Sequence, residues 1–421
     1  MRRAPESLWR SRSYLSIWVA ATVSNLGSML HGLALPFLAI DQIGASPGDL
    51  ALIRVSAVLP GLLFGLVAAT WVDRLPKRAL LIAMDLGRAI VVLWVPIAAW
   101  SGTLDLLQLC AVSALLGFME FIFEAAQQAV LPRIVPPDQL VEANSKLRAA
   151  SATTESLAFA AGGWLVQIFG AASVIAADAI SFLASALALI GVRPTEQATP
   201  AESESEERSI WLETGEGLRF LLRHPVLAPL AISAALMQMA WSAVGPVYLV
   251  FVYRELGFEP GVLGMVFAIG GASSVVGAVF CTRISRRLGA GRTLVLGSAL
   301  FAASIAMVPF APSAGAVGLA LLVLNQLGDG FEVLFDVNQR SLRQILTPEP
   351  LLGRVSGAIQ VAGAAAMLLG VVLGGLLGET VGTRATLGVA AGVVGLAALV
   401  IAFSPARRQP GDALEFEPPS G

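Results

Sequence analysis

Five acidic side chains lie inside otherwise apolar stretches of the sequence, in two sets. Glu120 and Glu124 are four residues apart, while Asp329, Glu332 and Asp336 follow one another at spacings of three and four. On an α-helix these spacings place each set on one face. A charge at the depth of a bilayer is costly unless it is paired or hydrated, so acids in such positions are candidates for function.

Glu120 and Asp329 are the deepest of these acids in their apolar stretches. A carboxyl group in such a place can load and release a proton, or it can bind a cationic substrate. The alternative is a structural role, in which these acids bond to nearby amide side chains: Asn25, Asn325 and Gln326. Glu332 belongs either to this pair or to the structural group described next.

Glu124 and Asp336 lie closer to basic loops, and we expect them to form structural ion pairs. The candidate partners of Glu124 are Arg74 and Arg78. The candidate partners of Asp336 are Arg286, Arg287 and Arg292.

Four further charged side chains lie in apolar stretches. Arg54 either contacts an anionic group of a substrate or pairs with Asp49. Asp85 and Arg88, three residues apart, are expected to satisfy each other. The spacing around Asp178 reveals no role for that acid.

The composition shows which elements must position these groups. Hydrophobic residues make up 56% of the 421 and charged residues 13%, which is typical of an integral membrane protein. The two cysteines, Cys110 and Cys281, lie in apolar stretches and offer neither a disulfide framework nor a metal site. Phosphate-binding loops, zinc motifs and nucleophile elbows are absent from the sequence, so we expect no enzyme activity, cofactor, metal or nucleic-acid partner.

A helix needs about 20 mostly apolar residues to cross the hydrocarbon core. The sequence predicts an all-α membrane protein with twelve such spans. They cover residues 14–40, 50–72, 79–100, 105–128, 147–169, 172–192, 226–252, 261–282, 292–311, 314–337, 354–378 and 382–403. The basic N-terminus leads into a first span that is too long for a signal peptide, so we expect this span to be retained.

Basic residues concentrate at the two termini and in the loops on the same side of the bundle, which places both termini in the cytoplasm. The excess of arginine over lysine is typical of a GC-rich bacterial genome. We therefore expect a multi-pass protein of a bacterial plasma (inner) membrane, and we expect it to be monomeric.

The chain divides into two halves that match each other. "QQAVLPRIVPPDQLVEANS" and "NQRSLRQILTPEPLLGRVS" align without a gap at an offset of 211 residues, which indicates an internal duplication. We predict an N-terminal six-helix half (1–192), a cytoplasmic linker with an amphipathic helix (193–224), a C-terminal six-helix half (225–404) and a cytoplasmic tail (405–421).

The loop "WVDRLPKR" places Asp73 at the end of a predicted span, where the helix dipole disfavours an acid. This loop resembles the signature of the major facilitator superfamily. "LPRIVPPDQLVEANS" and "AADAISFLASAL" are similar to patterns of its macrolide and enterobactin efflux branch. The resemblance implies two pseudo-symmetric six-helix halves that alternate around a central site. The alternative for the loop is that Lys77 and Arg78 merely anchor it at the cytoplasmic face.

The resemblance also implies a cytoplasmic gate, in which Asp73 meets the start of the eleventh span near Arg354. The corresponding gate and charge relay would involve these residues: Asp73, Arg74, Arg78, Glu124, Asp336 and Arg286.

We predict a secondary active transporter that exports amphipathic or hydrophobic small molecules by proton antiport, with Glu120, Asp329, Glu332 and Arg54 as candidate proton or substrate sites. The Gly-Pro that many antiporters carry in span five is replaced here by Ala158 and Phe159. Uptake or facilitated diffusion of a small metabolite is therefore an alternative. A membrane receptor or assembly partner that does not transport is another.

Overall fold

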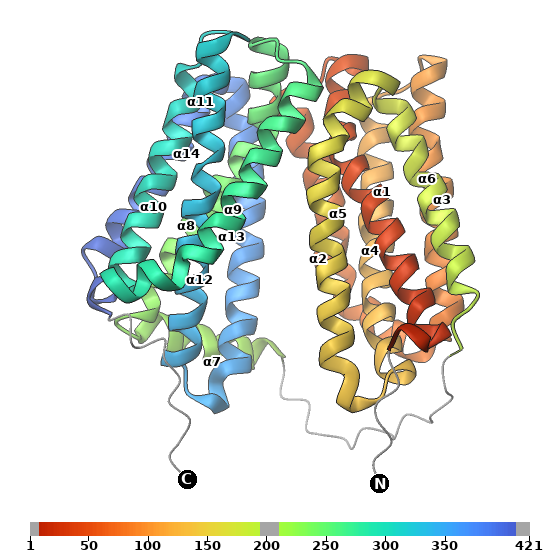
Figure 1. Ribbon diagram of the computed structural model, residues 1–421, viewed down its shortest axis with the longest axis horizontal. Helices are drawn as coiled ribbons and strands as arrows, with labels where there is room; N and C mark the ends of the chain where they lie inside the picture. The colour runs from red at the N-terminus through yellow and green to blue at the C-terminus, as the bar shows by residue number, and fades with distance from the viewer. Residues whose placement is uncertain (1–7, 194–209, 410–421) are drawn as a thin grey trace. The chain divides into compact units, whose positions relative to one another are not determined.

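The computed structural model describes residues 8–193 and 210–409, except for the side chains of residues 65–71, 73, 74 and 210–214. The described chain is helical and contains no β-strand. It forms two compact units, residues 1–201 with 259–265 and residues 202–258 with 266–421 (Figure 1). Half of the predicted linker (194–209) and most of the predicted tail (410–421) lie outside the described residues.

Unit 1 contains six long helices after a short 3₁₀ turn at Leu8–Arg10. They are α1 (Arg12–Ile43), α2 (Pro47–Arg74), α3 (Lys77–Ser101), α4 (Leu106–Ile134), α5 (Leu140–Phe169) and α6 (Ala171–Leu189). Each corresponds to a predicted span, and two of them, α4 and α5, extend beyond it by more than a turn.

Local sequence signals set the ends of these helices. Ser46 and Asp49 form a reciprocal capping box at the start of α2, and Asp105 caps the start of α4. Gly44 and Gly102 follow α1 and α3 with φ of 64° and 70°. Glycine is favoured at these two ends because a side chain disfavours the left-handed conformation.

Unit 2 begins with the amphipathic helix and continues with a second set of long helices. They are α7 (Ile210–Arg223), α8 (Leu227–Leu249), α9 (Pro260–Leu288), α10 (Ala290–Met307), α11 (Ala316–Gln326), α12 (Gly328–Leu346), α13 (Leu352–Thr380) and α14 (Thr383–Ala402). A π-helical segment, Val250–Glu255, extends α8.

The predicted span 314–337 lies largely within one candidate membrane span, Ala316–Leu346, whose helix is interrupted at a single turn residue. A turn at Leu327 separates α11 from α12, and helix continues to Leu346. Ser273 on α9 satisfies the interrupted backbone, since its hydroxyl donates to the Leu327 carbonyl (2.9 Å) and accepts from the Gly330 amide (3.1 Å). Gly330 permits this approach because a Cβ at that position would collide with Ser273.

The two units repeat one packing pattern. In unit 1, α1 packs on α5 and α6, and α3 packs on α4 and α6. In unit 2, the corresponding helix α8 packs on α13 and α14, and α10 packs on α12 and α14. The structural repeat agrees with the duplication seen in the sequence.

Eleven helical stretches of the described chain are long and apolar enough to cross a membrane. The predicted span 147–169 lies within α5, which is not among the eleven. Its apolar part contains Glu155 and Gln167, which lower its hydropathy.

The predicted surface helix is α7, whose charged and apolar residues segregate to opposite faces. It packs against α13. Glu216 on α7 pairs with Arg354 at the start of α13, with 2.7 Å between Oε2 and Nη1. Arg354 was expected close to the gate residue Asp73, whose side chain lies outside the described part of the chain.

A stripe of glycines lets α8 and α13 pack closely. A Cβ at Gly374 would collide with the backbone of Ala243, whereas a Cβ at Gly392 on α14 would meet nothing. We expect Gly374→Ala to destabilise unit 2 by about 1–3 kcal/mol through overpacking. Gly392→Ala is the matched control and should be neutral or slightly stabilising, because alanine is the better helix former. Thermal unfolding in detergent measures both, and equal midpoints would contradict the close packing.

Candidate functional site

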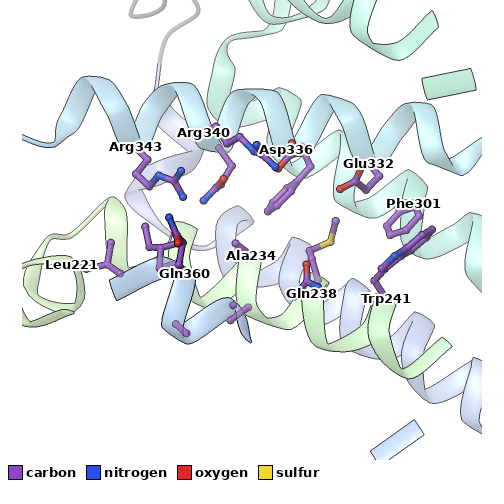
Figure 2. A pocket seen from close by; sticks show the side chains of 18 of the residues that line it. Leu221, Ala234, Gln238, Trp241, Phe301, Glu332, Asp336, Arg340, Arg343 and Gln360 are labelled. Atoms are coloured by element: carbon purple, nitrogen blue, oxygen red, sulfur yellow. The ribbon is translucent and has the colours of Figure 1, made fainter. Parts of the chain in front are cut away.

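A cavity of about 640 Å³ lies inside unit 2, mainly between α8, α12 and α13 (Figure 2). Residues of α8, α12 and α13 supply most of its wall, and α7, α9 and α10 supply one residue each. The lining comprises Leu221, Ala231, Ala234, Ala235, Met237, Gln238, Trp241, Ser274, Phe301, Asp329, Glu332, Phe335, Asp336, Gln339, Arg340, Arg343, Ile359, Gln360, Ala362 and Gly363. Its volume falls in the range of small-molecule sites, about 300–1,000 Å³.

One face of α12 supplies all of the charge in this lining. Asp329, Glu332 and Asp336 are followed on the same face by Arg340 and Arg343. The carboxylates occupy the half of the cavity nearest the helix break and the guanidinium groups occupy the other half, as Figure 2 shows for its labelled residues. The structure therefore brings the three predicted acids of unit 2 to one cavity.

Asp336 pairs with Arg340, one turn along the same helix, at 2.8 Å. This finding corrects the expectation that Asp336 pairs with Arg286, Arg287 or Arg292. Both partners are partly exposed, so the pair contributes little to stability. Asp329, Glu332 and Arg343 form no hydrogen bond or ion pair with any described residue.

Asp329 lies just after the turn at Leu327, in the first turn of α12. Leu327 keeps helical dihedrals (φ −64°, ψ −19°), and its amide still donates to the Val323 carbonyl. The interruption is therefore local, and Ser273 bonds to the backbone groups on its two sides.

Aromatic side chains line the cavity near the acids. Trp241 and Phe301 are in contact, with ring centroids 5.9 Å apart. Both rings are part of the cavity wall. An apolar or aromatic ligand body would fit this end of the cavity.

Sequence reasoning missed three polar residues of the cavity: Gln339, Arg340 and Arg343. The signal was present, because these residues continue the helical spacing of Asp329, Glu332 and Asp336. The predicted span ended at 337, so the part of the stripe beyond that residue was assigned to a loop. The helix instead continues to Leu346.

The acids of unit 1 lie in a different setting. Glu120 and Glu124 are both exposed on α4, and neither is in an ion pair with a described residue. Arg78, an expected partner of Glu124, instead donates to the Ile190 carbonyl at 2.6 Å. Asn25, an expected partner of the deep acids, donates to the Thr154 hydroxyl at 2.5 Å.

The structure describes the side chains of only some of the remaining gate residues. The side chains of Asp73 and Arg74 lie outside the described part of the chain. Arg286 lies in the last turn of α9. Arg54 is exposed on α2, and its expected partner Asp49 accepts a hydrogen bond from the Ser46 amide in the capping box at 2.8 Å.

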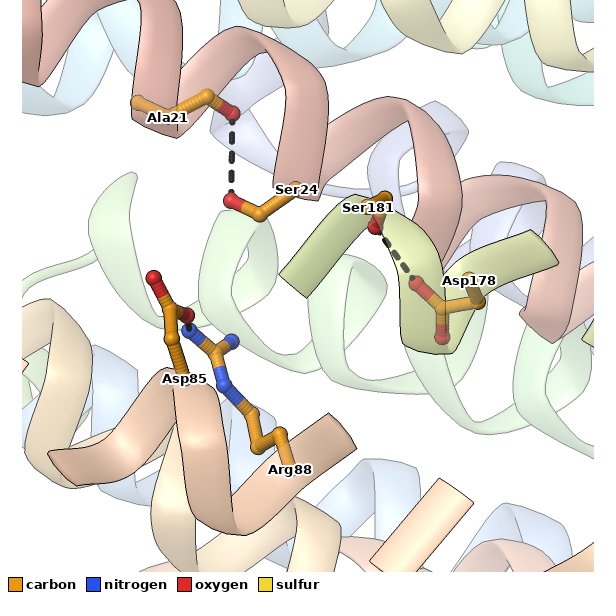
Figure 3. A network of polar contacts seen from close by, with 6 residues as sticks. All are labelled: Ala21, Ser24, Asp85, Arg88, Asp178 and Ser181. Atoms are coloured by element: carbon orange, nitrogen blue, oxygen red, sulfur yellow. Dashed lines mark hydrogen bonds and ion pairs between the residues drawn. The ribbon is translucent and has the colours of Figure 1, made fainter. Parts of the chain in front are cut away.

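Unit 1 also contains a buried polar cluster between α1, α3 and α6 (Figure 3). Asp85 and Arg88 form the expected pair, and both are almost fully buried. The Arg88 guanidinium lies over the rings of Phe123 (4.2 Å) and Phe182 (4.4 Å). The aromatic faces compensate for part of the hydration that Arg88 loses.

Asp178 belongs to the same cluster. It accepts a hydrogen bond from Ser181 at 3.1 Å, and its Oδ2 lies 3.3 Å from Nδ1 of His31. His31 on α1 and Asp178 on α6 are 8% and 2% exposed. Asp178 therefore links two helices of unit 1, a role that the sequence did not reveal.

A bundle of long apolar helices that encloses a charged cavity of this size is the architecture of a membrane transporter. The sequence model of the Major Facilitator Superfamily matches residues 17–336 and, in a second match, residues 230–419. The chain belongs to this superfamily of membrane transporters.

Curated relatives and solved structures agree with this assignment. An uncharacterised transporter of the superfamily from Bacillus subtilis, YfiS, is 27% identical over 380 residues, or 88% of each chain. The multidrug efflux pump Tap of Mycolicibacterium fortuitum is 27% identical over 381 residues, covering 88% of this chain and 90% of the pump. A bacterial homologue of the iron transporter ferroportin shares the fold, with a TM-score of 0.75 at 18% identity over 94% of this chain and 99% of its own.

The buried pair in unit 1 makes a prediction about stability. Arg88→Met leaves the fully buried Asp85 without a counter-charge, so we expect a loss of about 3–5 kcal/mol. Adding Asp85→Leu should restore part of this loss, because the double variant buries no charge. Chemical or thermal unfolding in detergent compares the stability of the parent protein, the single variant and the double variant.

The control for that experiment is Glu142→Gln, which breaks a partly exposed pair with Lys146. It should cost less than about 1 kcal/mol. If Arg88→Met were as mild as the control, the burial of the pair would have no energetic consequence.

Proposed function

We propose that this protein exports amphipathic or hydrophobic small molecules by proton antiport, with alternating access of its two six-helix halves. The observation that carries the proposal is the cavity of unit 2, where Asp329 and Glu332 have no ion-pair partner among the described residues and face an aromatic wall. The similarity to a multidrug efflux pump over most of both chains supports the direction of transport.

The charges of the cavity suit an exchange of proton and substrate. Three carboxylates face two guanidinium groups, and Arg340 already neutralises Asp336. Either a proton or a cationic group on a substrate would relieve the excess negative charge at Asp329 and Glu332. A proton and a cationic substrate cannot bind the same carboxylate at once. Competition between them would couple entry of the proton to export of the substrate.

The remaining features of the proposal follow the sequence. Glu120 would serve as a second proton or substrate site in unit 1, with Arg54 near an anionic substrate group. The charged loop at Asp73 would close the cytoplasmic gate. We propose that the two halves span residues 1–192 and 225–404 and that both termini lie in the cytoplasm. We further propose that the protein is a monomer in a bacterial plasma membrane and has no enzymatic activity.

Inverted membrane vesicles energised by a pH gradient test the coupling. We expect the double variant Asp329→Asn, Glu332→Gln to lower the initial rate of dye uptake into such vesicles at least about tenfold, which is 1.4 kcal/mol. The control is Asp138→Asn, which changes an exposed acid between α4 and α5 and should leave the rate unchanged. Glu120→Gln, measured alongside, reports the contribution of unit 1.

Three results would count against the proposal. Full pH-driven transport by the double variant would remove the two acids from the coupling. Accumulation of substrate in intact cells would favour uptake of a metabolite. Absence of any movement in proteoliposomes of the purified protein would favour a receptor or assembly partner.

A further inference from the structure

The charged stripe of α12 changes sign along the cavity, and neither end is neutralised by the protein. Asp329 and Glu332 at one end, and Arg343 at the other, form no hydrogen bond or ion pair with any other described residue. Only the middle of the stripe is satisfied, by the ion pair of Asp336 and Arg340. A cavity built for a simple cation would not need an available guanidinium group.

An amide on the cavity wall supports the interpretation of this stripe as a binding surface. Gln339 is only 4% exposed as a residue and lines the cavity, and its side chain forms no hydrogen bond with a described residue. Its amide atoms are not fully buried, so a ligand or water in the cavity can bond to them. Gln339 lies on α12 between Asp336 and Arg343, beside the path that a ligand joining the two ends would take.

We infer that the cavity of unit 2 binds zwitterionic amphipathic molecules, with the cationic group at Asp329 and Glu332 and an anionic group at Arg343. This inference rests on the proposed transport function and names its substrate class. Trp241 and Phe301 would hold the apolar body beside the cation. Gln339 would hydrogen-bond to its polar middle.

The helix sets the length of a suitable ligand. Eleven residues separate Glu332 from Arg343, which is about 16 Å along an α-helix at 1.5 Å per residue. The long arginine side chain shortens the gap but does not close it. The ligand must therefore carry its charges at opposite ends of an apolar body, and α-amino acids, whose charges are adjacent, are too short.

The test compares a zwitterion and a cation that differ in one group. A fluorescent trans-stilbene with a trimethylammonium group at one end and a carboxylate at the other carries its charges at opposite ends of an apolar body, and its methyl ester keeps the cation and loses the anion. Fluorescence polarisation with the purified full chain in nanodiscs gives the two dissociation constants. We expect the acid to bind about tenfold tighter than the ester, a factor typical of one charge-assisted hydrogen bond.

Variants assign the preference to a residue. Arg343→Gln should weaken binding of the acid about tenfold and leave binding of the ester unchanged, which also shows that the variant is folded. Arg343→Lys should keep most of the preference, because it keeps the charge. Asp329→Asn should weaken both dyes alike.

The inference is overturned if the ester binds as tightly as the acid, if the preference survives in Arg343→Gln, or if neither dye binds. A failure of the proposed function appears differently. In that case the acid binds with the expected preference, but proteoliposomes under a pH gradient do not move it.

Discussion

The energetic cost of charge in an apolar environment constrains this protein more than any other factor. A carboxylate or guanidinium group within a helical bundle must find a counter-charge, a hydrogen-bond network or water. The chain places acids on α3, α4, α6 and α12, so each unit needs a solution to the same problem. The solutions differ, and the difference shows where binding can occur.

Unit 1 pairs its most buried opposite charges with each other. Asp85 is paired with Arg88, the guanidinium lies over two phenylalanine rings, and Asp178 accepts from Ser181 and lies beside His31. The pairing is incomplete, because Asp85 Oδ2, Arg88 Nε and His31 Nδ1 have no hydrogen-bond partner among the described residues. Unit 2 instead leaves Asp329, Glu332 and Arg343 without partners around a cavity. Its charges remain available for substrate, proton or water.

The sequence predicted the class of fold well, because apolar length and loop charge follow directly from the bilayer. It also identified Asp329, Glu332 and Asp336 as neighbours on one face, since helical spacing is local information. It could not predict the break at Leu327, which depends on a hydroxyl of Ser273 some fifty residues away in the chain. The partner of Asp336 was mistaken for a different reason. The helix was expected to end at residue 337, so Arg340 was not expected on the same helix.

The duplicated spans show that the two sets of acids are not equivalent. At the offset of 211 residues, Glu120 and Glu124 correspond to Phe331 and Phe335, while Asp329 and Glu332 correspond to Phe118 and Phe121. These four acids therefore have aromatic counterparts in the other half, and the fifth, Asp336, corresponds to Ala125.

The asymmetry extends beyond the acids. Arg340 and Arg343 correspond to Ala129 and Pro132, so α4 lacks the positive end of the stripe. The broken helix is also confined to unit 2, because α4 runs without interruption from Leu106 to Ile134. A ligand with charge at both ends thus has complementary side chains at these spacings along α12, whereas α4 repeats neither its acids nor its arginines at the corresponding positions. Duplication supplied two similar scaffolds, and the distribution of charge along α4 and α12 distinguishes them.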